Sequence, residues 1–227
     1  MENLNSLEDN IGYQFKKKVL LRTVCTHRSY INEHRNENLE HNERIEFLGD
    51  AVLELIVTEY LFNNYPDPEG ILTSWRSALV RGTSLSDVAE EISLDDYMML
   101  SRGEKKSTGK SRKVILANAT EALIGAIYLD SGFESAKKFV KKYIINKLES
   151  IIKEGKHRDP KSDLQELMQE RNGVTPVYKL ISETGPDHNK NFITSVWLNN
   201  KELSQGEGRS KREAEQDAAQ KALEEIK

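Results

Sequence analysis

The stretch Asn42-Glu-Arg-Ile-Glu-Phe-Leu-Gly-Asp50 carries the strongest fold signal in this sequence. At about 100° per residue, Glu43, Glu46 and Asp50 project from one side of a helix, and apolar residues supply the surface around them. Glycine at position 49 costs a helix roughly 1 kcal/mol relative to alanine, which suggests that another element packs closely there. The pattern predicts an amphipathic helix with three carboxylates on one face. A solvated acidic face is the simplest account of those carboxylates.

A second segment, from Val114 to Leu129, is apolar nearly all round and predicts a buried helix. It holds Asn118 and Glu121 on the same face. A buried carboxylate must be paired, hydrogen-bonded, bound to metal or protonated, because burying it bare is very costly. A salt bridge to an arginine is one account of Glu121. In the other account, two carboxylate-bearing helices face each other and form an all-oxygen site for a hard cation such as Mg²⁺, with bound water as the nucleophile.

Helical periodicity extends to about residue 153, and the polar stretch that follows predicts a linker at 154–159. Apolar positions recur at helical spacing in the segments 39–63, 73–81, 86–93, 114–129 and 134–152. The stretch from Arg102 to Lys113 is strongly basic and contains glycine, so it predicts a mobile loop. Taken alone, that loop is most simply a solvated surface.

Beyond the linker the pattern changes from helical to mixed. A capping-box pattern, Ser162-Asp-Leu-Gln165, predicts the start of a short helix that ends near Gly173. A second capping box, Ser210-Lys-Arg-Glu213, predicts a helix that runs to the last residue. Between the two helices, three β-type segments are expected at about 176–183, 190–199 and 201–205. The predicted order is therefore α-β-β-β-α.

Composition bounds the compartment and the partners of the chain. Cys25 is the only cysteine among the 227 residues, so an internal disulfide is impossible and nothing suggests export. The first residues lack the basic start and apolar core of a signal peptide, and no apolar run approaches the roughly 20 residues that span a bilayer. A cytoplasmic protein without a membrane partner is expected. The net charge of −4 argues mildly against a nucleic-acid partner if it is considered alone.

Four motifs in order resemble those of the ribonuclease III family. The stretch 42–50 matches the family's signature almost residue for residue, and three later stretches, 26–30, 100–104 and 121–130, look like its following motifs. Residues 160–227 resemble the double-stranded-RNA-binding domain that ends the bacterial enzymes, so the resemblance covers the whole chain. It implies an all-α ribonuclease III nuclease domain with a helical extension at 1–153, a linker at 154–159 and a small α-β-β-β-α double-stranded-RNA-binding domain at 160–227.

The resemblance also implies roles for the acidic residues. Glu46 and Asp50 match the active-site carboxylates of the signature, and Glu121 matches the essential glutamate of the later helix. These three are the expected catalytic residues, and with Asn118 they are the expected ligands of Mg²⁺, for which Mn²⁺ would substitute. Asn118 departs from the family, which usually has an aspartate there. An amide oxygen can ligate Mg²⁺ but brings no charge, so the affinity for metal should fall.

Further positions take expected roles from the same resemblance. Glu43 and Glu69 match acidic residues that line the family's catalytic valley, and Phe47 matches the residue that inserts into the partner subunit of the homodimer. The expected RNA contacts lie on the first helix, in a loop between strands and at the start of the last helix; these are Gln165, Glu166, Gln169, His188, Ser210, Lys211 and Arg212.

The function implied is metal-dependent endonucleolytic cleavage of double-stranded RNA, which leaves 5′-phosphate and 3′-hydroxyl ends. Ribosomal RNA precursors and other structured transcripts are the expected substrates. Two alternatives stay open. Asn118 permits a catalytically silent protein that binds double-stranded RNA, and cleavage of duplex DNA would indicate a carboxylate–metal nuclease of another class.

Overall fold

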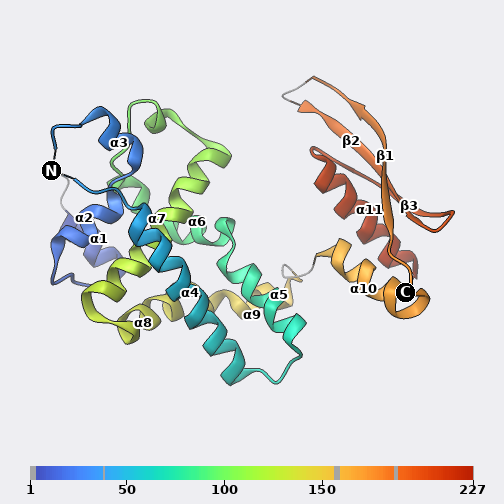
Figure 1. Ribbon diagram of the computed structural model, residues 1–227, viewed down its shortest axis with the longest axis horizontal. Helices are drawn as coiled ribbons and strands as arrows, with labels where there is room; N and C mark the ends of the chain where they lie inside the picture. Colours follow the sequence, from blue (N-terminus) through green and yellow to red (C-terminus); the bar gives the residue numbers. More distant parts are fainter. Residues whose placement is uncertain (1–3, 38, 156–158, 187–188, 227) are drawn as a thin grey trace. The chain divides into compact units, whose positions relative to one another are not determined.

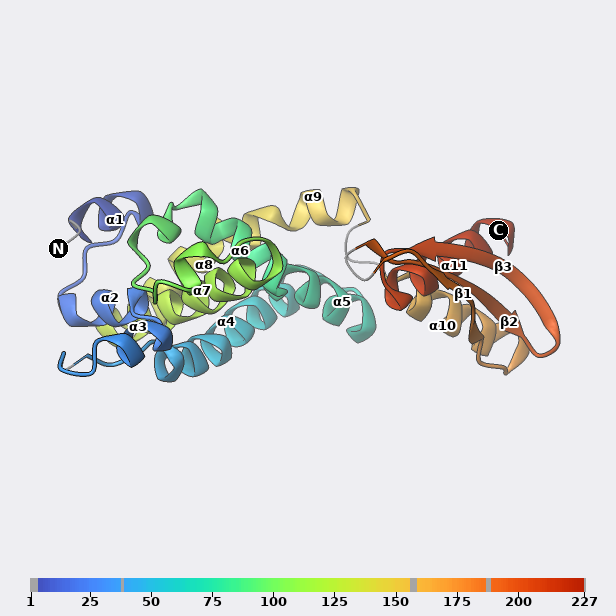
Figure 2. The ribbon, with the colours of Figure 1, turned by 90° about the horizontal axis from the view of Figure 1, so that it is seen from above.

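The computed structural model describes residues 4–37, 39–155, 159–186 and 189–226 (Figure 1). The chain divides into two compact units, Met1–His157 and Arg158–Lys227. The first unit is helical and the second contains a sheet with two helices, as Figure 2 also shows from a second direction. The predicted fold class, an all-α nuclease domain followed by an α-β-β-β-α domain, is confirmed. The predicted linker at 154–159 overlaps residues 156–158, which lie outside the described residues.

The first unit is built around one long buried helix, α7. Its elements are α1 (Leu4–Ile11), α2 (Lys18–Cys25), α3 (Arg28–Glu33), α4 (Glu43–Asn64), α5 (Glu69–Val80), α6 (Gly82–Glu91), η1 (Leu94–Tyr97), η2 (Glu104–Lys106), α7 (Gly109–Ser131), α8 (Phe133–Tyr143), η3 (Ile145–Lys147) and α9 (Leu148–Lys153). Helix α7 packs against α4, α6, α8 and α2. Among the described residues it alone is long and apolar enough to cross a membrane, yet 67% of its most apolar window is buried within this unit. It is a core helix.

Several predicted helix boundaries in this unit are wrong. Helix α7 begins at Gly109, so the last part of the basic stretch from Arg102 to Lys113 is helical and not loop. Arg112, in the first turn, pairs with Asp95 and so ties this turn to the preceding 3₁₀ element. The segment expected as one helix over 134–152 is interrupted by η3. Helices α1, α2 and α3 have only six to eight residues each and were not predicted individually.

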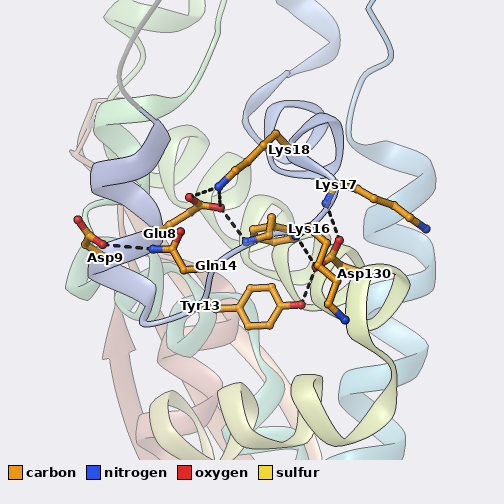
Figure 3. Close-up of polar contacts among 9 residues, drawn as sticks. Glu8, Asp9, Tyr13, Gln14, Lys16, Lys17, Lys18 and Asp130 are labelled. Carbon is orange, nitrogen blue, oxygen red and sulfur yellow. Dashed lines mark hydrogen bonds and ion pairs between the residues drawn. The ribbon is translucent and has the colours of Figure 1, made fainter.

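Two buried carboxylates attach the N-terminal helices to the rest of the unit (Figure 3). Glu8 is fully buried and accepts hydrogen bonds from the Phe15 backbone N–H (2.7 Å) and from Lys18 Nζ (2.6 Å). Asp130, near the end of α7, accepts from the backbone N–H groups of Lys16 (3.0 Å) and Lys17 (2.8 Å). These two N–H groups lie at the start of α2, where a helix has no internal acceptors for them.

The Tyr13 hydroxyl donates a third hydrogen bond to Asp130, at 2.8 Å. Burial alone would raise the pKa of Asp130, but the hydrogen bonds from Lys16, Tyr13 and Lys17 outweigh it, and the pKa lies below its ordinary value. A carboxyl with a lowered pKa stabilises the fold above the pKa of the unfolded chain, and this contribution is lost as the pH falls through the folded value. Asp130 is therefore a pH-dependent link between α7 and the start of α2.

The second unit is a three-stranded antiparallel sheet with two helices packed together. Its elements are α10 (Pro160–Asn172), β1 (Val177–Thr184), β2 (Asn191–Leu198), β3 (Lys201–Gly208) and α11 (Lys211–Ile226), and the strand order is β1-β2-β3. Leu164 and Met168 of α10 and Val196 of β2 form its core together with alanines of α11. Asn199 adopts a positive φ of 54° in the turn between β2 and β3. This left-handed conformation, which asparagine tolerates, permits the tight turn.

One predicted helix start in this unit is wrong and the other is correct. Helix α10 begins at Pro160, and Asp159 caps it by accepting from the Lys161 N–H at 3.0 Å. Proline at the first helical position, where the missing N–H costs nothing, fixes this start two residues before the Ser162 capping box. At α11, Ser210 Oγ accepts from the Glu213 N–H at 3.2 Å, as the second capping box predicts.

Asp130→Ala should lower the free energy of unfolding of the first unit by about 2–4 kcal/mol, because two buried N–H groups lose their acceptor. Urea unfolding followed by far-UV circular dichroism measures the change. Asp9→Ala is the matched control, since Asp9 accepts a single exposed hydrogen bond from Gln14 at 3.3 Å. The loss in the Asp130 variant should shrink as the pH is lowered toward the pKa of this carboxyl. Equal effects of the two substitutions would contradict the role given to Asp130.

Candidate active site

Helices α4 and α7 cross with their backbones in direct contact. A Cβ atom on Gly49 would lie 1.8 Å from the carbonyl oxygen of Glu121, and one on Gly125 would lie 2.4 Å from the carbonyl oxygen of Ile45. Any larger side chain at these two positions would force the helices apart. The close packing that the glycine in the signature stretch predicted is therefore the contact with α7. Acidic side chains within one turn of this crossing are held near one another by the backbone itself.

The crossing brings Glu46 and Asp50 of α4 together with Asn118 and Glu121 of α7. Burial and then the charges of Asp50 and Glu46 raise the pKa of Glu121 to about 7. The pKa of Glu46 is also raised, first by burial, then by Glu43 and, to a smaller extent, by Asp50. The Asn118 amide donates a hydrogen bond to Glu46, which opposes this rise. Glu46, Asn118 and Glu121 are half-buried, while Asp50 is exposed.

These carboxylates have no cationic partner among the described residues. Neighbouring acidic residues of α4 do: Glu43 pairs with Arg28 at 3.3 Å, and Glu54 pairs with Arg76 at 3.1 Å. No described lysine or arginine forms an ion pair with Glu46, Asp50 or Glu121. The salt bridge to an arginine that the sequence left open as an account of Glu121 is thus absent from the described part of the chain. The site carries negative charge that the described side chains do not neutralise.

The donor chemistry of this group fits a hard divalent cation. Carboxylate and amide oxygens are the ligands that Mg²⁺ and Mn²⁺ take. In the described residues, however, no three Asp, Glu, His or Cys side chains converge closely enough to form a ready coordination shell. Coordination would therefore require these side chains to move toward a common point while the helix backbones stay in place.

Two of the other predicted acidic residues lie apart from one another. Glu43 begins α4, one turn before Glu46, with His41 Nδ1 at 3.7 Å from its carboxylate. Glu69 begins α5, beyond the opposite end of α4, and accepts a hydrogen bond from the Thr73 hydroxyl at 3.1 Å. From Asp50 to the end of α4 at Asn64 the helix rises about 20 Å. A single copy of the chain does not bring Glu69 to the crossing.

Phe47 belongs to an exposed apolar stripe that the sequence analysis missed. Phe47 is 81% exposed, Leu55 58% and Phe62 77%. Their spacing of eight and seven residues places them on one face of α4, beside the acidic side chains. Near Phe62, a hollow of about 570 Å³ lies between α4 and α5, with Glu69 and Arg76 in its wall. The alternation of apolar residues around α4 hid this stripe, because it resembles a core helix.

In the second unit, the predicted RNA-binding residues that can be located are exposed. Gln165, Glu166 and Gln169 lie on α10, where they line a shallow hollow. Lys211 and Arg212 are exposed in the first turn of α11, and Ser210 caps that helix. The free N–H groups and the dipole of a helix start favour phosphate. His188 lies outside the described residues.

Comparison with known proteins assigns both units. Residues 17–148 match the family described as ribonuclease-III-like, and residues 160–226 match the double-stranded RNA binding motif. The chain belongs to the ribonuclease III family. Ribonuclease 3 of Carboxydothermus hydrogenoformans is 46% identical over 227 residues, covering 100% of this chain and 97% of that protein. Ribonuclease 3 of Listeria innocua is 43% identical over 230 residues, covering 100% and 99%.

A solved structure supports the same assignment for the first unit. The nuclease domain of ribonuclease III from Campylobacter jejuni, described as flexible in a region involved in dimer formation, is 43% identical, with a TM-score of 0.57; the match covers 63% of this chain and 96% of that one. The predicted resemblance is thus confirmed. The chain is a double-strand-specific endoribonuclease, and ribonuclease III enzymes depend on metal.

Gly49→Ala should destabilise the first unit, although alanine favours helix by about 1 kcal/mol. The added methyl would meet a backbone carbonyl that cannot move aside, and we expect a net loss of about 3 kcal/mol or more. Gly70→Ala is the control, because a Cβ there meets nothing within 4 Å. Thermal unfolding of both variants measures the difference. A Gly49→Ala chain as stable as the parent would mean that the helices do not meet at this glycine.

Proposed function

We propose that Glu46, Asp50, Asn118 and Glu121 hold a divalent cation, Mg²⁺ or in its place Mn²⁺, and that Glu46, Asp50 and Glu121 are the catalytic residues. The observation that carries the proposal is the set of three carboxylates without a cationic partner at the α4–α7 crossing, where like charges help raise the pKa of Glu121 to about 7. A cation would remove this repulsion. The products would carry 5′-phosphate and 3′-hydroxyl ends.

The side chains of the site divide the work. A bound cation would supply an activated water and neutralise charge that develops on the phosphate. Asp50 is exposed and can meet the RNA backbone from solvent, whereas Glu46 and Glu121 are held half-buried beside it. Ligation requires ionised carboxylates, so Glu121 would release its proton when the cation binds. Metal affinity should therefore fall as the pH drops below about 7.

The second unit would supply recognition of the duplex. A-form RNA presents its minor groove and its phosphates, and a protein reads their shape with polar and cationic side chains. Gln165, Glu166 and Gln169 are proposed to face one minor groove and His188 the next. Lys211 and Arg212 would bind phosphates at the start of α11, with Ser210 capping that helix. The overall charge of −4 implies modest affinity for one unit, with avidity from two copies.

We propose that the apolar stripe of α4 is covered by a second copy of the chain, with Phe47 at the interface. Three large apolar side chains exposed by more than half on one helix face are unusual for a surface that stays in water. Leu55 lies near the midpoint between Phe47 and Phe62. An antiparallel second copy centred on Leu55 would therefore set Phe47 against the hollow beside Phe62 of the other copy, twice, as a two-fold interface requires.

The same arrangement would complete the acidic site. Glu69 follows the far end of α4, so an antiparallel copy would carry its Glu69 toward the end of α4 that holds Glu43 and Glu46. The catalytic valley predicted from Glu43 and Glu69 would then be built from two chains. Each homodimer would have two such valleys, one for each strand of the duplex.

Ribosomal RNA precursors and other structured transcripts are the substrates we propose, with the cytoplasm as the compartment. Long duplexes within such transcripts offer the minor-groove and phosphate surface that the second unit would bind. The specificity would come from helical shape and length, since base edges are hidden in the deep major groove.

Cleavage of a uniform RNA duplex across a Mg²⁺ titration tests the site. Glu121→Gln should lower the cleavage rate by about 100-fold or more while duplex binding is kept, since removing one group that stabilises transition-state charge costs at least that much. For the parent chain, the Mg²⁺ concentration at half-maximal rate should rise up to about tenfold per pH unit below 7, as one proton competes with the cation. A parent chain that binds duplex but cuts at no Mg²⁺ or Mn²⁺ concentration would sink the catalytic proposal.

Phe47→Glu should convert the proposed homodimer to monomers, because it places a charge in the apolar interface. Sedimentation velocity measures the change, and cleavage should fall in parallel as the second copy's Glu69 is lost from the valley. Val19→Glu is the matched control, since Val19 is 66% exposed and lies on α2, away from the stripe. If the parent chain is already monomeric while it cuts duplex RNA, the interface is refuted.

A further inference from the structure

Asn118 occupies a position in the site that only a neutral donor can fill in this way. It lies on α7 one turn before Glu121, and its amide donates a hydrogen bond to the Glu46 carboxylate across the crossing. An ionised carboxylate has no proton to donate and would meet Glu46 as a like charge. The exchange of an amide for a carboxylate therefore changes the sign of the interaction with Glu46.

The crossing makes this sign important. Because α4 and α7 touch through Gly49 and Gly125, the helices cannot move apart to relieve repulsion between acidic side chains. With Asn118, three carboxylates share the site and one of them has a hydrogen-bond donor. With an aspartate at that position, four carboxylates would share it and none would have an internal donor from α7.

We propose that Asn118 is a positioning residue whose amide holds the Glu46 carboxylate in place while the site is without metal. The nuclease unit then keeps its folded site in the absence of a divalent cation, and in return it binds that cation more weakly than a site with four carboxylates. The inference rests on the proposed metal site. It adds that Asn118 sets how far the stability of this unit depends on divalent cations.

A ligand that binds only the folded state stabilises it in proportion to its affinity and concentration. A chain with Asn118→Asp should therefore begin less stable without metal and gain more stability as metal is added. A chain with Asn118→Leu, which keeps the side-chain volume but has neither donor nor charge, should lose stability without metal and should gain no more than the parent. A merely structural role for Asn118 would lower both variants equally at every metal concentration.

The test is thermal unfolding of the full chain, followed by far-UV circular dichroism, in EDTA and then across a MgCl₂ titration. In EDTA we expect the melting temperature to fall by several degrees for Asn118→Asp and by less for Asn118→Leu, relative to the parent. The deficit of Asn118→Asp should close or reverse at saturating MgCl₂. Asn146→Asp is the matched control: it adds the same charge and loses one amide hydrogen bond, from Asn146 to the Lys142 carbonyl at 3.2 Å. Its shift should be the same in EDTA and in MgCl₂.

Two outcomes separate this inference from the proposed metal site. An Asn118→Asp chain as stable as the parent in EDTA would overturn the positioning role, whatever the response to MgCl₂. If the melting temperature of the parent and of Asn118→Asp does not respond to MgCl₂, and Glu121→Gln changes nothing in that response, the metal site fails. The order of stabilities in EDTA would then still support or refute the hydrogen bond to Glu46 on its own.

Discussion

The contact between the backbones of α4 and α7 is the constraint on which the nuclease unit depends. It sets the distance between the helices, and the acidic side chains must accept whatever repulsion follows. The apolar burial of α7 outweighs that repulsion. Each large buried side chain contributes roughly 1.5–3 kcal/mol, and α7 buries Ile115, Leu116, Leu123, Ile124 and Ile127. Two like charges about 4 Å apart cost about 4 kcal/mol at an effective dielectric constant of about 20, and less when they lie farther apart.

The second unit uses the same device for a different purpose. A Cβ atom on Gly206 of β3 would lie 2.1 Å from the backbone nitrogen of Ala218 on α11. Glycine on the strand and alanine on the helix let the two backbones touch, and this contact fixes where α11 begins. Lys211 and Arg212 then emerge at a defined place beside the sheet. In both units, small residues determine where the charged residues lie.

Much of the fold could be predicted from the sequence because long elements carry long patterns. Helices α4 and α7 and the three strands each repeat their apolar period often enough to identify the element, although boundaries moved where caps competed, as at Asp159 and Ser162. Helices α1 to α3 are too short for such a repeat. Glu8 looks like a solvated charge in the sequence, because its partners, the Phe15 N–H and Lys18, become evident only once the chain turns back on itself. In the site, the helical period could place Glu46 with Asp50, and Asn118 with Glu121. It could not show that the Asn118 amide donates to Glu46, since that depends on how the two helices cross.

The core of the second unit has a consequence for its motions. Alanine supplies four of the buried positions of α11, so this unit of about 70 residues removes little apolar surface from water. Its amide protons should exchange with solvent through frequent opening, at a lower free energy than those of α7. Bound duplex would suppress such opening by mass action. The nucleic acid would then act as part of the folded core's support, and a chain without RNA would expose this segment first to cellular proteases.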